Sequence, residues 1–190
     1  MYPSAPHSSR RSVEALRKRL PHLDGRAIRI RFLPALSAGR RKLYSNRDQG
    51  QPVHAGTFIR KRNIVLDLEL AGKPAELGRI LTHELFHFAW VRMGNPTRRS
   101  YEDLLHREWK QRALGELGWS AELRKSVLSS NPGSHTHKKW RDYACESFCD
   151  TAAWLYSGIA RHPEFTLAHR HRKRREEWFH ATFQGRRIPI

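Results

Sequence analysis

The segment from Pro74 to Met93 constrains the fold more than any other part of the chain, because its pattern predicts one long helix. Pro74 suits the first turn of a helix, and Gly94 before Asn95-Pro96 is a natural stop. Between these ends, apolar residues recur at helical spacing: Leu77, Ile80, Leu81, Leu85, Phe88 and Ala89. The fold must therefore bury this apolar face against other elements.

Strand patterns come before this helix and helical patterns after it. Alternating apolar residues predict strands at 28–32, 53–59 and 63–70, while 35–53, with Gly39 and Gly50, is expected to be a loop. Helices are expected at 101–117, after Ser120, and at 140–156. This order predicts an α+β fold in which a small, partly antiparallel sheet packs on the helix and a mostly helical C-terminal half follows.

The 190 residues suit one domain with polar ends. Residues 1–11 are rich in Ser, Pro and Arg and are expected to be a disordered tail, with a short helix starting at Ser12. Residues 12–160 are expected to form the folded domain, and 161–190 a basic helix or tail.

The net charge of +18 comes from 36 Lys and Arg against 18 acidic residues. The tightest basic run is 169–175. Such a charge attracts nucleic acid or acidic proteins weakly and in a salt-sensitive way. A solvated basic surface without a specific partner is the alternative.

No stretch approaches the roughly 18 apolar residues that a membrane span needs, and 1–19 has no apolar run typical of a signal peptide. The two cysteines, Cys145 and Cys149, are too few for a disulfide framework. They could ligate metal but are expected to be small core residues. A cytoplasmic location is the expectation.

The sequence His83-Glu-Leu-Phe-His87 lies in the middle of the predicted helix. Histidines at i and i+4 share one face and could bind one metal ion, and imidazole ligands favour zinc. Glu84 projects beside that ion, where it could act as the general base on a water molecule. The alternative is a pair of ordinary surface histidines.

Catalytic zinc usually has three protein ligands, so a third is needed. Glu146 and Asp150 lie one helical turn apart in a half-buried helix, where two carboxylates are costly without a neutralising charge. Zinc bound by Glu146, with Asp150 accepting a hydrogen bond from a ligand histidine, would provide that charge. Ion pairs with some of the many arginines are the alternative.

On these residues the chain resembles the gluzincin metallopeptidases, which pair His-Glu-x-x-His with a later Glu-x-x-x-Asp. The resemblance covers 64–93 and 140–157 and implies a zincin-like domain. It implies His83, His87 and Glu146 as zinc ligands, Glu84 as general base and Asp150 as the orienting residue. The metzincin pattern is excluded, because Trp90 and Met93 stand where it requires Gly and His.

An alternative third ligand is His106, nineteen residues after His87. In that case the chain would be similar to SprT-type proteases, which act around DNA. However, Arg107 replaces the glycine typical of that motif.

The sequence thus predicts a zinc-dependent peptidase acting on a peptide or protein substrate. Tyr143, His135 or His137 could stabilise the oxyanion, and the 63–70 strand could hold substrate by strand addition. A polyanion-binding protein with a non-catalytic zinc site is the alternative from another class.

Overall fold

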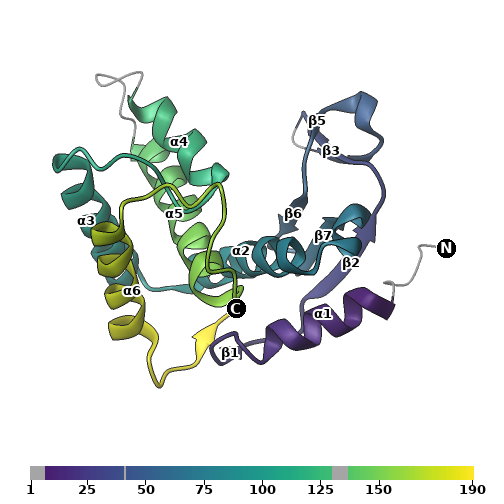
Figure 1. The fold of residues 1–190 in the computed structure, drawn as a ribbon, viewed down its shortest axis with the longest axis horizontal. Coiled ribbons are helices and arrows are strands. Elements are labelled where there is room, and N and C mark those ends of the chain that lie inside the picture. The colour runs from purple at the N-terminus through teal and green to yellow at the C-terminus, as the bar shows by residue number, and fades with distance from the viewer. Residues whose placement is uncertain (1–6, 41, 130–136) are drawn as a thin grey trace.

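The computed structural model describes residues 7–40, 42–129 and 137–190. Its helices are α1 (His7–Arg17), η1 (Arg47–Gln49), η2 (Leu68–Gly72), α2 (Pro74–Arg92), α3 (Asn95–Lys110), α4 (Trp119–Ser129), α5 (His137–Tyr156) and α6 (His169–Phe183). Its strands are β1 (Leu23–Asp24), β2 (Arg29–Leu33), β3 (Leu36–Gly39), β4 (Lys42–Ser45), β5 (Gln51–Pro52), β6 (Ala55–Phe58), β7 (Asn63–Asp67) and β8 (Ile188–Pro189). Strands β1 to β7 precede helices α2 to α6, so the predicted α+β class is confirmed (Figure 1).

Helix α2 lies between the strands on one side and helices α3 to α6 on the other (Figure 1). Twelve of its nineteen residues are buried, and they occupy all of its faces. A helix buried all round is typical of the centre of a domain. The apolar face expected from the sequence is therefore only part of the surface that α2 buries.

The main sheet has the order β2-β7-β6, with β7 parallel to β2 and antiparallel to β6. Ile64 and Leu66 of β7 are fully buried in the core cluster that includes α2. The strand expected at 63–70 ends at Asp67, where the chain turns into η2. Because β7 has a partner on each side, substrate cannot add to it as expected. The edge strands of this sheet are β2 and β6.

The prediction of a loop over 35–53 is wrong. This segment contains a second, antiparallel sheet of order β4-β3-β5. A Cβ on Gly50 would lie 2.3 Å from the carbonyl oxygen of Ala38, so the close approach of β5 to β3 requires glycine. Asp67 joins the two sheets by accepting the Leu36 N–H at 2.8 Å.

The helices depart from their predicted bounds mainly at their ends. Helix α1 begins at His7, inside the expected tail, and α3 spans Asn95–Lys110 rather than 101–117. Pro96 lies in the first turn of α3, where a missing N–H costs nothing. No helix of the described residues has the length and apolarity needed to cross a membrane.

The C-terminal segment 161–190 packs into the same core as the rest of the chain. Phe179 and Phe183 of α6 and Ile188 of β8 are buried in one cluster with residues of α2 and α5. Strand β8 also pairs in parallel with β1, which returns the C-terminus to the N-terminal part of the fold. The residues after 160 are therefore part of the domain rather than an appended tail.

A buried charge network joins α6 to α3, α4 and α5. Arg175 is fully buried, and its guanidinium lies 2.6 Å from Glu108 Oε2 and 2.7 Å from Glu116 Oε2. Lys125 lies 2.9 Å from Glu116 Oε1, so two cations balance two carboxylates. Burial opposes ionisation of Glu116, but Arg175 and Lys125 hold its pKa below the usual value. We refer to Arg175, Glu108, Glu116 and Lys125 as the buried charge network.

We expect Arg175→Met to lower the free energy of unfolding by about 3–5 kcal/mol, because it leaves Glu108 and Glu116 buried without their main partner. The matched control is Lys173→Met, which changes an exposed cation of the same helix and should shift it by no more than about 0.5 kcal/mol. Urea unfolding of both variants measures the difference, and equal effects would contradict the structural role of the network.

Candidate metal centre

His83, Glu84 and His87 lie in the middle of α2, and the facing residues come from the neighbouring helix α5. His83 and Glu84 are buried, at 7% and 9% exposure. The ring centroids of His83 and His87 are 4.8 Å apart, as expected for i and i+4. The motif is therefore buried in the core rather than displayed on an outer helix face.

Asp150 fixes the orientation of His83. Its Oδ1 lies 2.7 Å from His83 Nδ1, and its Oδ2 accepts the N–H of Ala121 at 2.9 Å. A Cβ on Gly118 would lie 2.3–2.5 Å from the carboxylate atoms, so glycine leaves the space that Asp150 occupies. His83 therefore directs its Nε2 away from Asp150, as a metal-binding histidine does when its other nitrogen is hydrogen-bonded.

Glu146 approaches the same nitrogen atoms from α5. Its Oε2 lies 3.2 Å from His83 Nε2 and 3.9 Å from His87 Nε2. The structure thus brings together the three ligands expected from the sequence, with Asp150 behind His83.

Two thiols lie on the other side of His87. The Sγ atoms of Cys145 and Cys149 are 3.5 and 3.4 Å from His87 Nδ1. His83, His87 and Cys149 each offer a ligand atom, and these atoms lie within 4.8 Å of one another. This buried group could hold a metal ion. The sequence did not indicate that the cysteines contact His87, because their spacing only places them on a shared helix face.

Charges at the centre depend on protons carried by histidine. Burial disfavours the charged form of His83, but the charge and hydrogen bond of Asp150 raise its pKa well above the usual value. Burial likewise opposes protonation of His87, but Cys145 and Glu146 raise its pKa to about 9. Burial disfavours ionisation of Glu146, yet the hydrogen bond with His83 and the two histidine charges lower its pKa to about 2. The negative charge of Glu146 is therefore balanced by imidazolium groups, and a metal cation could take their place.

Glu84 is held from the sheet side by a residue that the sequence did not single out. Thr57 of β6 donates to Glu84 Oε2 at 2.5 Å and lies 3.3 Å from the Glu84 carbonyl oxygen. Only the packing of β6 beside α2 brings these residues together, so no local sequence signal identifies Thr57.

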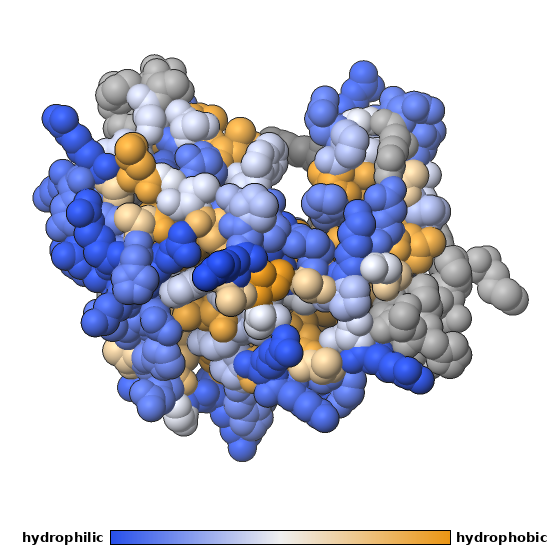
Figure 2. Space-filling model, in the orientation of Figure 1, coloured by the Kyte–Doolittle hydropathy of each residue, from blue (hydrophilic) through white to orange (hydrophobic). Residues whose placement is uncertain are grey.

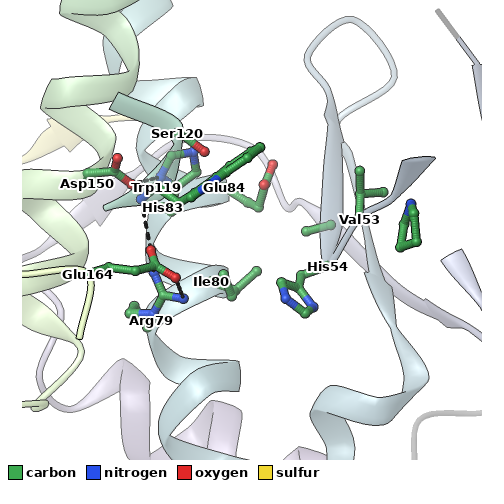
Figure 3. A pocket seen from close by; sticks show the side chains of 12 residues that line it. Val53, His54, Arg79, Ile80, His83, Glu84, Trp119, Ser120, Asp150 and Glu164 are labelled. Carbon is green, nitrogen blue, oxygen red and sulfur yellow. Dashed lines mark hydrogen bonds and ion pairs between the residues drawn. The ribbon is translucent and has the colours of Figure 1, made fainter. Parts of the chain in front are cut away.

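Two cavities meet at the centre. The larger, of about 440 Å³, extends past Ile80 and Trp119, and the smaller, of about 330 Å³, extends past His87 and Val91. Both are lined by Ala55, His83, Glu84 and Ser120. Figure 3 views the larger cavity, with Val53 and His54 on the strand side and Trp119, Asp150 and Glu164 opposite. They are two halves of one groove, which continues on both sides of Glu84.

The other candidate residues lie elsewhere. Tyr143 is 1% exposed and donates to Glu116 at 2.5 Å, so its expected role as oxyanion donor is not supported by its position. His106 is exposed on α3, with Nδ1 2.9 Å from the Glu102 carbonyl oxygen and its ring against Trp140, and belongs to no ligand group within the described ranges. His137 is exposed at the start of α5, and His135 lies outside the described residues.

The chain matches no family model, no curated protein and no solved structure. The chemistry of the centre must therefore be argued from its own geometry.

We expect Asp150→Asn to weaken binding of a divalent metal about 10- to 100-fold, because a neutral amide orients and polarises His83 less well than a carboxylate. Asp142→Asn, an exposed position on the same helix, is the matched control. Competition with a chromophoric chelator measures the affinity. An unchanged affinity in Asp150→Asn would contradict the role of Asp150.

Metal binding at pH 7.5 should release about two protons, one from each histidine, because only neutral imidazole binds a metal. The pKa of His83 is well above its usual value and that of His87 is about 9, so both carry a proton in the ion-free protein at this pH. Affinity should therefore rise with pH through about 9, where His87 loses its proton. Calorimetry in buffers of different ionisation enthalpy counts the protons, and binding without proton release would contradict the charge balance described above.

Proposed function

We propose that this chain is a zinc-dependent endopeptidase with His83, His87 and Glu146 as zinc ligands and Glu84 as general base. One observation carries the proposal: Glu146 Oε2 lies 3.2 and 3.9 Å from the Nε2 atoms of the two histidines, and all three side chains line the groove beside Glu84. Two imidazoles and a carboxylate are a donor set typical of catalytic zinc.

Glu146 is a better third ligand than Cys149 for two reasons. Asp150 occupies Nδ1 of His83, so the metal must bind at Nε2, which is the atom that Glu146 approaches. Cys149 instead lies at Nδ1 of His87, is fully buried and lines neither half of the groove. A metal bound through Cys149 would lie in the closed interior, whereas hydrolysis needs an open coordination position.

A zinc ion, when bound, would polarise the water molecule and the peptide carbonyl. Glu84 would take a proton from that water as its oxygen attacks the carbonyl carbon. As the carbon–nitrogen bond breaks, Glu84 would deliver the proton to the leaving amine, which leaves one carboxylate and one amine product. The hydrogen bond from Thr57 would hold one oxygen of Glu84 and so limit the directions in which the carboxylate can face.

The shape of the groove favours a chain that passes through it. Strand β6 is the edge strand next to Glu84, and edge strands can pair with an extended peptide. Since cavities lie on both sides of Glu84, residues before and after the cleaved bond would both be accommodated. The charged residues Arg79 and Glu164 in the larger cavity are paired at 2.9 Å, so they are not available to bind a chain terminus. These features support internal cleavage over removal of terminal residues.

The larger cavity would receive a bulky apolar side chain. Its lining includes Val53, Ile80 and Trp119, and the Trp119 side chain is 63% exposed. An exposed aromatic residue beside a groove is typical of a contact that becomes buried when a ligand binds.

The test is zinc per chain and peptide-library cleavage for the wild type and four variants: Glu84→Gln, Glu146→Gln, Cys149→Ser and His106→Ala. We expect Glu84→Gln to keep one zinc and lose at least about 100-fold in cleavage, the scale of general acid–base catalysis. Glu146→Gln should lose zinc affinity, while Cys149→Ser and His106→Ala should keep both zinc and cleavage.

The other outcomes are equally informative. Cleavage retained by Glu84→Gln would overturn the mechanism, and zinc loss in Cys149→Ser with retention in Glu146→Gln would assign a buried thiolate site instead. Zinc loss in His106→Ala would favour the SprT-like alternative. If the wild type binds zinc but cleaves no peptide, the result would support the alternative of a protein with a non-catalytic zinc site.

A further inference from the structure

A cluster of exposed cations lies where the last turn of α3 meets the first turns of α6. Its members, here called the basic surface, are Arg107, Lys110, Arg112, Arg170, Lys173 and Arg174, all of which are exposed. The two helices are joined at this point by a hydrogen bond of 2.7 Å from Arg174 to Gln111. Figure 2 shows hydrophilic side chains gathered over these helices.

Acidic neighbours neutralise the basic surface only in part. The stretch 165–175 contains no acidic residue, and the one acid in 104–112 is Glu108, which is buried and bonded to Arg175. Acidic residues flank both stretches, and Glu177 lines a cavity together with Arg107 and Arg174. The six exposed cations outnumber the flanking acids Glu102, Asp103, Glu176 and Glu177. The buried charge network below is itself balanced, so it does not neutralise the exposed cations. Their charge therefore faces the solvent.

The placement of these charges is unfavourable for the isolated protein. The first turn of α6 contains basic residues and no acid, although the positive end of a helix favours negative groups. His171, in the first turn of α6, is buried, and burial together with Arg170, Arg174 and Arg175 lowers its pKa against the opposing charge of Glu108. An anion at this surface would relieve the repulsion among these cations.

We propose that the basic surface binds the phosphate backbone of nucleic acid without reading its sequence. A protein partner would need an apolar centre in the interface, because such interfaces have apolar cores and polar rims. Most exposed large apolar residues of the described part lie on α2 and α4, and only Leu114 borders this surface. Interfaces with nucleic acid are polar and strongly positive, which matches the residues present.

The buried charge network anchors α6, which carries half of the basic surface, to α3. Arg175 lies in the same run as Arg174 and Lys173 but points inward to Glu108 of α3 and Glu116. Within this one basic run, Arg175 thus anchors the helix while Lys173 and Arg174 face the solvent. For 161–190 the sequence predicted a basic helix or tail, and cations held on an ordered helix lose less backbone entropy on binding than cations on a tail.

The experiment is fluorescence anisotropy with labelled 20-base-pair DNA and RNA duplexes and the full-length, zinc-loaded chain, over 50–300 mM KCl. The test variant is Arg170→Gln/Lys173→Gln/Arg174→Gln. The matched control is Arg29→Gln/Arg60→Gln/Lys61→Gln, which removes three exposed charges from the strand half of the protein. Thermal melting and zinc content of both variants check that each is folded.

We expect the slope of log affinity against log salt to fall in magnitude by about 2–3 in the test variant, since each lost phosphate contact contributes about 0.9. The control should change the slope by less than about 1, because distant charges act only through the general field.

Equal loss of slope in both variants would overturn the proposal, because binding would then reflect net charge alone. It would also be overturned if poly-glutamate at equal charge concentration displaced the duplex as well as unlabelled duplex does, since the surface would then suit acidic protein equally. The proposal would also be excluded if the wild type bound neither duplex at 50 mM KCl. None of these readouts depends on peptide cleavage.

Discussion

The carboxylate of Asp150 is the point on which the arrangement of the helices around the groove depends. It is 3% exposed, yet it contacts His83 of α2 through one oxygen and the N–H of Ala121 in α4 through the other. Gly118 approaches it so closely that no side chain fits between them. A buried carboxylate is tolerated only when such partners are present. The position of α4 and the direction of the His83 ring are therefore set by the same group.

The protein contains two buried clusters of charge, and they differ in how they are neutralised. In the buried charge network, Glu108 and Glu116 face the permanent cations Arg175 and Lys125. At the candidate metal centre, the acids face histidines, whose positive charge can be lost to solvent or replaced by a metal. The first cluster is closed and joins helices, while the second lines a groove. Buried carboxylates must be neutralised in both clusters. In the first cluster the neutralising cations are permanent, whereas in the second the protons on histidine can be exchanged for a metal ion.

Sequence patterns predicted the elements whose signals are local. Helix α2 matches its expected span because its apolar spacing is regular and Pro74 and Gly94 mark its ends, and Glu146 and Asp150 face it as their one-turn spacing suggested. The sheet at 36–52 escaped prediction because its strands have two to four residues, too short to display an alternation. The sequence did not indicate the roles of Thr57 and Arg175, and it suggested a different role for Tyr143. Their partners are distant in sequence, at separations of 27 to 67 residues, so no local pattern identifies them.

Strand β6 and helix α2 form the two sides of the groove at Glu84. They contact each other less extensively than helices α2 and α5 do. Helices α2 and α5 share an extensive aromatic core that includes Phe86 and Phe148, whose ring centroids are 5.8 Å apart. At the groove, by contrast, strand β6 is joined to α2 by the hydrogen bond that Thr57 donates to Glu84. The hydroxyl of Thr57 donates to the Glu84 carboxylate, and its oxygen lies 3.3 Å from the Glu84 carbonyl oxygen, so one side chain holds the edge strand next to the proposed base. The width of the groove and the direction of the Glu84 carboxylate are therefore coupled.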